Sequence, residues 1–288
     1  MKPMEIQPEC LGCLERLVEL AVSLATADPE LRGQARVAAR KIIAREFRPG
    51  AIPARIANRY HLAIQAVTGN SDPFGPRKAA ETAFLARLYE KTAPAYGEDL
   101  HSLLKLAVLG NAVDYFREEA EVAEQMFSPV EFAVSHLPDF LQELSRGPGL
   151  LLYLADNAGE QFFDRPLLDH LRSRGWEARY VVKGGPIQND MTRMDLYASG
   201  LGEALEPVAD SGARTVGLEL ERVSPEFQRL FDRADLILAK GMGHFETLSH
   251  THDPRVFFLL QAKCPPVALA LGVSPGGFVF GRGTFADG

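Results

Sequence analysis

The stretch GLLLYLADNAGE, residues 149–160, combines an apolar run with an abrupt polar ending. The run from Leu150 to Ala155 carries no charge, which is typical of a strand buried on both faces of a sheet. Asp156 and Asn157 follow it directly. A strand that only builds a core has no need of two adjacent oxygen-bearing side chains at its end, although a helix cap or a turn also uses them. The stretch predicts a buried strand with a candidate ligand site at its carboxyl end.

The rest of the C-terminal half repeats this pattern of short apolar runs separated by amphipathic segments. A helix is expected at 161–173, stopped by Gly175. Buried strands that alternate with helices indicate βαβ units and a parallel sheet. The further strands that we expect are 177–183, 234–240 and 266–271, with weaker candidates at 205–210 and 217–220.

The N-terminal half instead shows apolar residues at helical spacing. Asp28 and Pro29 form a helix start signal, and Ser128, Pro129 and Glu131 repeat that logic. The helices that we expect are 10–27, 30–46, 52–68, 76–93, 97–112 and 129–145, with a weaker one at 115–126.

The change of pattern near residue 148 predicts an α/β protein with a helical domain at 1–147 and an α/β domain with a mostly parallel sheet at 148–288. The net charge of −7 and the lack of a basic block argue against nucleic acid as the main partner. No window approaches the roughly 20 apolar residues of a membrane span, and the N-terminus lacks the apolar core of a secretory signal. With only three cysteines, a disulfide framework is not expected, and we predict a cytoplasmic protein.

Polar chemistry follows three of the four predicted strands. The loops are DNAGE after the first, KGGPIQND (183–190) after the second and AKGMGHFETL (239–248) after the third. The carboxyl ends of parallel strands meet at one edge of a sheet, so these loops should converge. Asp156, Asn157 and Asp190 are hard oxygen ligands, suited to Mg²⁺, Mn²⁺ or a similar divalent ion.

Phosphate chemistry fits the same loops. Ala158 and Gly159 open a helix and let backbone N–H groups approach phosphate oxygens, while Lys183 and Lys240 supply positive charge. A metal ion between carboxylates and a phosphate, with a lysine opposite, is the equipment for phosphoryl-group hydrolysis. The same oxygen cluster would also serve a binding protein that senses a metal or a phosphometabolite without turnover. Lys240 alone has an ordinary alternative as a solvated side chain at a strand end.

Several longer segments closely resemble the domain-of-unknown-function 89 family. They are LADNAGE (154–160), VVKGGPIQNDMT (181–192), ADLILAKGMGHFETL (234–248) and KCPPVALALGV (263–273). In the N-terminal half PECLGCLERL (8–17), DPFGPRKAA (72–80) and LAVLGNAVDYF (106–116) have counterparts there as well. The resemblance spans nearly the whole chain and is to the short stand-alone prokaryotic subgroup of these metal-dependent damage-control phosphatases, which are ARMT-like.

The resemblance implies more than the residues alone. It implies a helical N-terminal bundle packed on a Rossmann-like α/β domain, with the active site between them. A divalent ion (Mn²⁺, Ni²⁺, Co²⁺ or Mg²⁺) would be held by Asp156, Asn157 and Asp190, and Lys240 would contact the substrate phosphate. The other substrate-binding positions would be Asn111, Asp114, Ala158, Gly159 and Glu160. The implied substrates are small phosphorylated metabolites such as sugar phosphates. A methyltransferase activity, suggested for some relatives, lacks a glycine-rich loop after the first strand.

Other polar residues of the sequence give weaker signals of function. The subgroup commonly has Asn where this chain has His244, and we expect a surface histidine there, with phosphate binding or tuning of the pH dependence as the alternative. Cys10 and Cys13 form a lone CxxC, which leaves buried thiols and metal or redox work as alternatives. His250 and His252 are expected in a solvated loop. The chain has no Gly-x-Ser-x-Gly elbow, Walker loop or dinucleotide fingerprint, which argues against serine hydrolases, ATPases and NAD-dependent enzymes.

Overall fold

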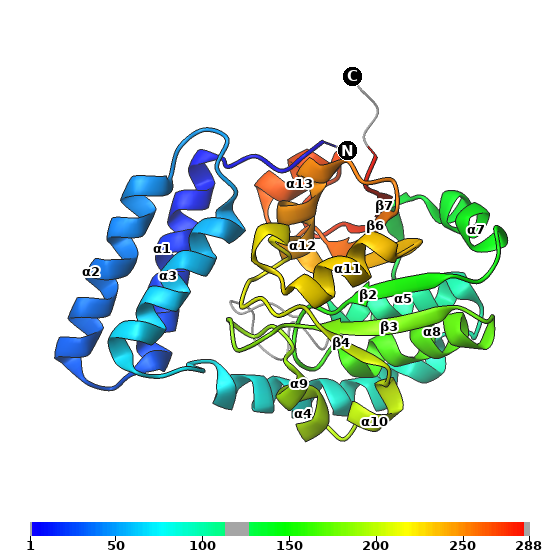
Figure 1. Cartoon of the computed structure of the whole chain (residues 1–288), viewed down its shortest axis with the longest axis horizontal. Helices are drawn as coiled ribbons and strands as arrows, with labels where there is room; N and C mark the ends of the chain where they lie inside the picture. The colour runs from blue at the N-terminus through cyan, green and yellow to red at the C-terminus, as the bar shows by residue number, and fades with distance from the viewer. Residues whose placement is uncertain (1, 113–126, 285–288) are drawn as a thin grey trace.

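The computed structural model describes residues 2–112 and 127–284, and its centre is a seven-stranded sheet (Figure 1). The strand order is β1-β7-β6-β5-β2-β3-β4. The strands are β1 (Phe132–Ser135), β2 (Leu150–Leu154), β3 (Glu177–Val182), β4 (Val208–Asp210), β5 (Leu236–Lys240), β6 (Val256–Gln261) and β7 (Phe278–Arg282). The predicted α/β class with a mostly parallel sheet is confirmed.

The direction of the chain changes at the middle of this sheet. From β2 the chain builds outward through β3 and β4, and it then returns to add β5 and β6 on the other side of β2, all parallel. β7 is antiparallel to β6, and β1 pairs with β7. The loop after β2 therefore leads to one face of the sheet and the loop after β5 to the opposite face. This divergence creates a crevice at the carboxyl ends of these two strands.

Helices cover both faces of the sheet, and a separate bundle lies beside it (Figure 1). One face carries α4 (Gly75–Thr92), α5 (Leu100–Gly110), α7 (Leu137–Ser145), α8 (Gln161–Ser173), α9 (Arg193–Ala198) and α10 (Gly202–Leu205). The other face carries α11 (Pro225–Arg233), α12 (Gly241–Leu248) and α13 (Pro265–Leu271). The bundle consists of α1 (Pro8–Ala25), α2 (Pro29–Glu46) and α3 (Pro53–Thr68), with a core of its own.

Local sequence explains why the bundle forms. Asp28 caps α2, because its Oδ1 accepts hydrogen bonds from the backbone N–H groups of Glu30 at 2.8 Å and Leu31 at 3.1 Å. Ala35 and Ala39 are fully buried, so small side chains let α2 pack closely against its neighbours. The predicted helices at 10–27, 30–46, 52–68, 76–93, 97–112 and 161–173 are confirmed within a few residues.

Two strand predictions in the C-terminal half are wrong. Residues 266–271 lie in α13, since Pro265 and Pro266 open a helix and Gly272 ends it in the left-handed conformation. The strand next to β5 is instead β6, which the sequence analysis missed. The weaker candidate at 217–220 is a loop that ends in a 3-10 turn, and Gly217 has a φ of 68°. The candidate at 205–210 contains β4.

The predicted helix at 129–145 is wrong in its first half. Phe132–Ser135 is the edge strand β1, whose residues alternate between half-buried and exposed. α7 begins only at Leu137, with Pro138 in its first turn, so the expected cap at Ser128 does not start a helix. The predicted helix at 115–126 lies outside the described residues. None of the helices in residues 2–112 and 127–284 is long and apolar enough to cross a membrane.

Candidate functional site

The loops after β2 and β3 meet at the crevice between the two directions of the sheet. The backbone N–H of Ala158 donates to the carbonyl of Asn189 at 2.9 Å, and that of Met191 donates to the carbonyl of Asp156 at 2.8 Å. Asn157 and Asp190 are thereby paired in an isolated antiparallel bridge. These backbone bonds bring the predicted ligands Asp156, Asn157 and Asp190 together, although they come from different strands.

Two amide side chains hold the carboxylates of this crevice. Asn111 ends α5, and its Nδ2 lies 2.9 Å from both Asp156 Oδ2 and Glu160 Oε1. Asn157 Nδ2 lies 2.8 Å from Asp156 Oδ2 and 2.6 Å from Glu160 Oε1. Since both amide nitrogens serve the carboxylates, the Oδ1 of Asn157 is its ligand atom for a cation. Asn111 thus reaches the site as expected, while Asp114 lies outside the described residues.

Three carboxyl groups are buried here within electrostatic reach of one another. Asp156, Glu160 and Asp190 are 7%, 1% and 2% exposed. Burial, and then repulsion by Glu160 and Asp190, raises the pKa of Asp156 to about 8. Burial raises the pKa of Asp190 to about 6, against the opposing charge of Lys183. Burial also acts to raise the pKa of Glu160, but the charge of Lys240 outweighs it and lowers that pKa. Asp156 and Asp190 are thus two buried acids that resist ionisation, and a positive charge between them would stabilise their charged forms.

Lys240 lies beneath these carboxylates. It is fully buried, and its Nζ donates to Asp164 Oδ1 at 2.6 Å and to the carbonyl of Ala107 at 2.8 Å. It also forms an ion pair with Glu160 Oε2 at 2.8 Å. The charges of Asp164 and Glu160 raise the pKa of Lys240 above its ordinary value, although burial opposes them. All three ammonium hydrogens therefore have acceptors inside the protein.

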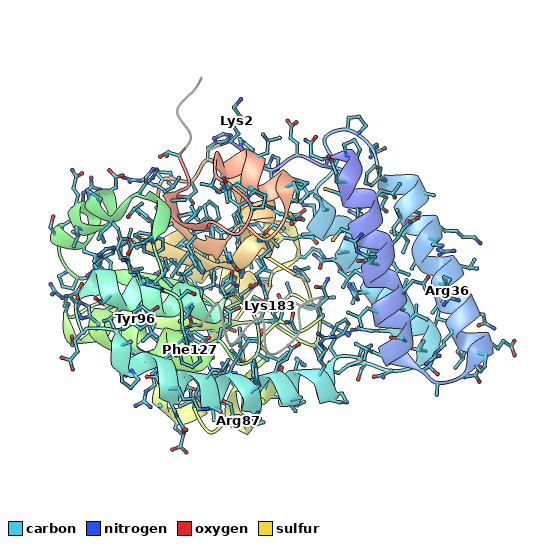
Figure 2. All side chains as sticks on the ribbon, turned by 180° about the vertical axis from the view of Figure 1, so that it is seen from behind. Lys2, Arg36, Arg87, Tyr96, Phe127 and Lys183 are labelled. Atoms are coloured by element: carbon cyan, nitrogen blue, oxygen red, sulfur yellow. The ribbon has the colours of Figure 1, made fainter. Side chains whose placement is uncertain are left out.

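Lys183 occupies the other side of the crevice and lies near the middle of the molecule (Figure 2). Its Nζ lies 2.6 Å from the carbonyl of Gly217, 3.1 Å from His244 Nε2 and 3.3 Å from Asp190 Oδ2. His244 is 2% exposed, so the expected surface histidine is wrong. Its Nδ1 lies 2.6 Å from the carbonyl of Lys240 and must donate there, which leaves Nε2 to accept from Lys183. His244 thus orients Lys183 toward Asp190.

The backbone N–H groups expected to meet a phosphate have partners within the protein. Gly159 N donates to the Gln161 side chain at 2.6 Å, and Glu160 N donates to the Asn157 carbonyl at 3.2 Å. α8 begins only at Gln161. The glycine after Lys240 is required by close packing: a Cβ on Gly241, whose φ is 79°, would lie 1.9 Å from Asp156 Oδ2.

Lys263 is the site residue that the sequence analysis missed. It follows β6, is half-buried, and its positive charge acts to lower the pKa values of both Asp156 and Glu160. The signal was available in the apolar run VFFLLQ (256–261), whose carboxyl end places Lys263 at the same edge of the sheet. Glu160 was expected to bind the substrate, whereas in the structure its carboxylate is hydrogen-bonded within the cluster.

The donor set fits a hard divalent cation. Asp190 Oδ2 is buried and receives no hydrogen bond from the described residues, and Lys183 is its ion-pair partner. Carboxylate and amide oxygens are the ligands that such ions prefer. Within residues 2–112 and 127–284, no group of three or more His, Cys, Asp or Glu side chains is placed to hold a metal ion, so the candidate ligands are two carboxylates and one amide. The set therefore suits an open site, in which water or a substrate oxygen completes the shell.

Comparisons with known proteins show the family of this chain. A model of the damage-control phosphatase ARMT1-like domain matches residues 6–278. This chain belongs to that family. Damage-control phosphatase PH1575 of Pyrococcus horikoshii is 37% identical over 98% of this chain and 99% of its own length. A damage-control phosphatase of Archaeoglobus fulgidus is 30% identical over 96% of this chain and 98% of its own length.

The family resemblance extends to three dimensions. The crystal structure of a DUF89 family protein, PH1575 of Pyrococcus horikoshii, has a TM-score of 0.86 and 36% sequence identity to this chain. The match covers 98% of this chain and all of that one. The membership expected from the sequence motifs is thus confirmed.

The remaining candidate residues lie apart from this cluster. Cys10 is buried, Cys13 is exposed and Cys264 is half-buried, and these three cysteines form no disulfide. His250 lies in a 3-10 turn, where its Nε2 is 2.6 Å from the carbonyl of Met4. His252 follows this turn with a φ of 50°. The described residues around them provide no group of three metal-ligating side chains.

Proposed function

We propose that this protein is a divalent-metal-dependent phosphatase that hydrolyses small phosphorylated metabolites, such as sugar phosphates or related damaged phosphometabolites. The observation that carries the proposal is the cluster of Asp156, Glu160 and Asp190, buried together at the switch point of the sheet. Family membership supports it, since relatives over nearly the full length are named damage-control phosphatases. We include a cytoplasmic location in this proposal, because the described cysteines form no disulfide.

Asp156, Asn157 and Asp190 would hold the ion. When bound, a divalent ion polarises the phosphoryl group and lowers the pKa of a coordinated water. The residues around it prepare this site: Asn111 fixes Asp156 and Glu160 through its amide nitrogen, and Lys183 faces Asp190. Either Asp156 or Asp190 could serve instead as the base or the nucleophile, and the proposal leaves this step open.

The assignment of the lysines follows from their surroundings. Lys240 has three acceptors inside the protein, so its main contribution is to neutralise Glu160 and Asp164 beneath the site. Lys263 is half-buried at the same edge of the sheet, and its positive charge acts to lower the pKa values of Asp156 and Glu160. We therefore assign the substrate phosphate to Lys263, with Lys240 as a positioning residue for the carboxylates.

The proposal is tested by phosphate release from metal-stripped protein. The substrates are p-nitrophenyl phosphate and a panel of sugar phosphates, each with Mn²⁺, Co²⁺, Ni²⁺, Mg²⁺ or no metal. We expect turnover only with metal, and the ranking of the panel narrows the substrate class. A saturable thermal shift with metal and sugar phosphate but no released phosphate, for every metal, would favour a non-catalytic sensor and contradict the proposal.

The contribution of Lys263 is tested in the same assay. Lys263→Met should raise the Michaelis constant of the substrate about tenfold or more, because a charge-assisted contact to phosphate is lost. Lys105→Met, which removes a lysine paired with Glu131 on the surface, is the matched control and should leave the constant unchanged. An unchanged constant in Lys263→Met would remove this residue from the phosphate site.

A further inference from the structure

The first turns of α1 carry the Cys10–Cys13 pair, which the strand-end cluster does not use. Cys10 is the third residue of α1 and Cys13 lies three residues later, so both stand on the same side of the helix. In regular helical geometry their Cα atoms lie about 5 Å apart, which is within the range that a disulfide bridges. Helical side chains also lean toward the N-terminus, which brings the thiol of Cys13 toward Cys10. The pair can therefore close a disulfide within one helical turn.

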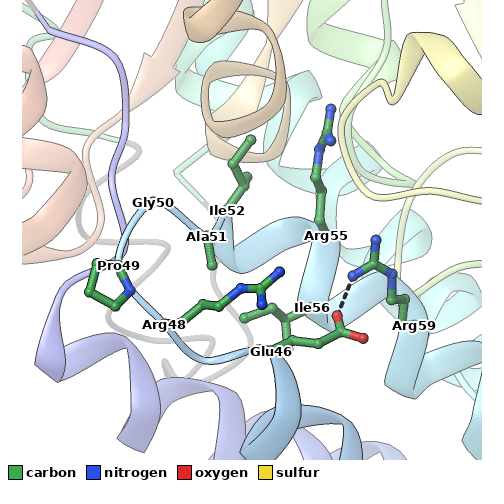
Figure 3. A pocket seen from close by; sticks show the side chains of 9 residues that line it. All are labelled: Glu46, Arg48, Pro49, Gly50, Ala51, Ile52, Arg55, Ile56 and Arg59. Carbon is green, nitrogen blue, oxygen red and sulfur yellow. Dashed lines mark hydrogen bonds and ion pairs between the residues drawn. The ribbon is translucent and has the colours of Figure 1, made fainter.

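The fold holds this helix start against other parts of the molecule. The backbone N–H of Ile6 donates to the carbonyl of Ala51 at 3.3 Å, and Ala51 lies in the loop between α2 and α3 (Figure 3). Cys10 belongs to the apolar cluster that includes residues of α12 and α13, and Cys264 packs against the same cluster. The motif near one end of the chain thus lies close to a third cysteine near the other end.

The two thiols of the pair differ in exposure. Cys13 is exposed, so a reagent in solution reaches it. Cys10 is 7% exposed, and its Sγ accepts a hydrogen bond from the backbone N–H of Gln7 at 3.4 Å. Burial raises the pKa of the Cys10 thiol, which makes it the slower of the two to react with an external reagent. Cys13 is therefore suited to attack first, and Cys10 to react second from within the protein.

A carboxyl group at the contact between α3 and α12 lies within electrostatic reach of these thiols. Glu246 accepts a hydrogen bond from the backbone N–H of Ala54 at 2.8 Å, and burial raises its pKa to about 7. Its charge acts to raise the pKa values of Cys10 and Cys264. A carboxylate with a pKa near neutrality is suited to take a proton from a thiol.

We propose that Cys10 and Cys13 form a reversible dithiol–disulfide site, which a low-molecular-weight disulfide oxidises. The Cys13 thiolate attacks one sulfur of the oxidant, whose S–S bond breaks; a mixed disulfide forms at Cys13, and the leaving thiolate takes up a proton. Cys10 then gives its proton to Glu246 and attacks the Cys13 sulfur, which closes the protein disulfide and releases the second thiol. The protein loses two electrons and two protons, and the oxidant is reduced to two thiols.

Thiol chemistry fits this pair better than a metal site does. Among residues 2–112 and 127–284, no group of three or more His, Cys, Asp or Glu side chains is placed to hold a metal ion. In the reducing compartment that we propose for this protein, disulfides are typically transient and sense redox changes. The dithiol chemistry uses none of the strand-end carboxylates, so it is independent of the proposed phosphatase activity.

The test is mass spectrometry of the reduced full chain after treatment with oxidised glutathione and an acid quench. Trypsin cleaves after Arg16 and after Lys263, so it separates the pair from Cys264. We expect the wild-type peptide 1–16 to lose two hydrogen atoms, because its two thiols form a disulfide. Cys264 should stay unmodified in the folded protein, because burial raises its pKa to about 12.

Variants separate the two steps. Cys10→Ser should stop after the first step and keep the glutathione adduct on Cys13. Glu246→Gln should slow the conversion of this adduct to the disulfide about tenfold or more, without slowing its formation. Glu221→Gln is the matched control, because it removes an exposed acid that pairs with Arg55, and it should behave as the wild type. Cys264→Ser should also leave both steps unchanged.

Three results would overturn the dithiol site. They are a wild-type peptide 1–16 that does not react, a wild-type glutathione adduct that never converts to the disulfide, and a disulfide that links this peptide to Cys264. An unchanged rate of conversion in Glu246→Gln would overturn the assignment of the proton to Glu246. The deciding result comes from the wild type, so it does not depend on the folding of a variant.

Discussion

The α1–α3 bundle and the crevice at the strand ends are both well buried, but they bury opposite kinds of side chain. The bundle core is apolar, with fully buried Val18, Ala21 and Ala39 and one buried histidine, His61. Burial lowers the pKa of His61 to about 3, so this residue stays neutral. The crevice instead buries carboxyl groups and lysines within a few ångströms of one another.

This difference separates residues that stabilise the fold from residues that we propose bind a ligand. Buried ion pairs rarely stabilise a protein more than an apolar core of the same volume would. A set of carboxyl groups with raised pKa values is therefore weak evidence for stability and better evidence for a cation that binds there. Substitutions in the two regions test this difference.

Removing a proposed ligand should have the largest effect on activity. Asp156→Ala is expected to lower metal-dependent phosphate release at least about 100-fold, while circular dichroism shows an unchanged fold, because a strand-end side chain adds little to the core. Asp169→Ala, which removes an exposed acid of α8, is the control and should keep full activity. Full activity in Asp156→Ala would show that the ligand assignment is wrong.

Lys240→Met should chiefly reduce stability. The substitution leaves Glu160 and Asp164 buried without their cation, and breaking such a pair costs about 3–5 kcal/mol. The free energy of unfolding in urea measures this loss. If stability is unchanged and only the Michaelis constant rises, Lys240 contacts the phosphate directly, as the sequence motif implies.

The stability of the metal-free protein should fall as the pH rises from about 4 to about 8. Asp156 ionises near 3.8 in the unfolded chain but near 8 in the folded protein, so the folded state holds the extra proton between these values. The Asn side chain of Asp156→Asn cannot ionise. The loss of unfolding free energy between pH 5 and pH 8 should therefore be smaller in this variant, by an amount on the order of a few kcal/mol. Urea unfolding at pH 5 and pH 8 in chelator measures it, and identical slopes in both proteins would contradict the burial of this acid.

A Tyr→Phe substitution should affect the free energy of unfolding differently in the two regions. Tyr153 donates its hydroxyl to Asp164 Oδ1 at 2.6 Å, so Tyr153→Phe should lower the free energy of unfolding by about 1.5–3 kcal/mol. The hydroxyl of Tyr60, in the bundle, is buried without a partner among the described residues. Tyr60→Phe should therefore be neutral or stabilise the protein by about 1 kcal/mol. A loss of stability in Tyr60→Phe equal to that in Tyr153→Phe would remove the contrast.

Local patterns were sufficient for much of this fold. Caps such as Asp28 and the uncharged run at Leu150–Leu154 specify their elements within a few residues of sequence. The run at 266–271 was wrongly predicted as a strand, because apolar periodicity does not distinguish a short buried helix from a strand. The two prolines at 265 and 266 are the signal that indicates a helix start. Because the strand was predicted at 266–271 and not at 256–261, its carboxyl end was placed wrongly and Lys263 was not recognised as a site residue.

The sequence was sufficient to predict which candidate ligands lie together, but not which contacts support them. Asp156, Asn157 and Asp190 are marked by their positions after strands, and the backbone brings them together. The environments of Lys240 and His244 depend on partners distant in sequence: Asp164 lies 76 residues from Lys240, and Lys183 lies 61 residues from His244. Only tertiary packing reveals that both are buried, so no local pattern could separate them from surface residues.

The most direct test of the central claim is a crystal of the protein soaked in Mn²⁺, with data collected to record anomalous scattering from manganese. The account predicts a single strong anomalous peak at the carboxyl ends of β2 and β3, within coordination distance of Asp156, Asn157 and Asp190. The peak should be absent from Asp190→Ala crystals soaked in the same way. Full-occupancy manganese elsewhere, or none at these residues, would contradict the claim that the buried carboxylates exist to hold a cation.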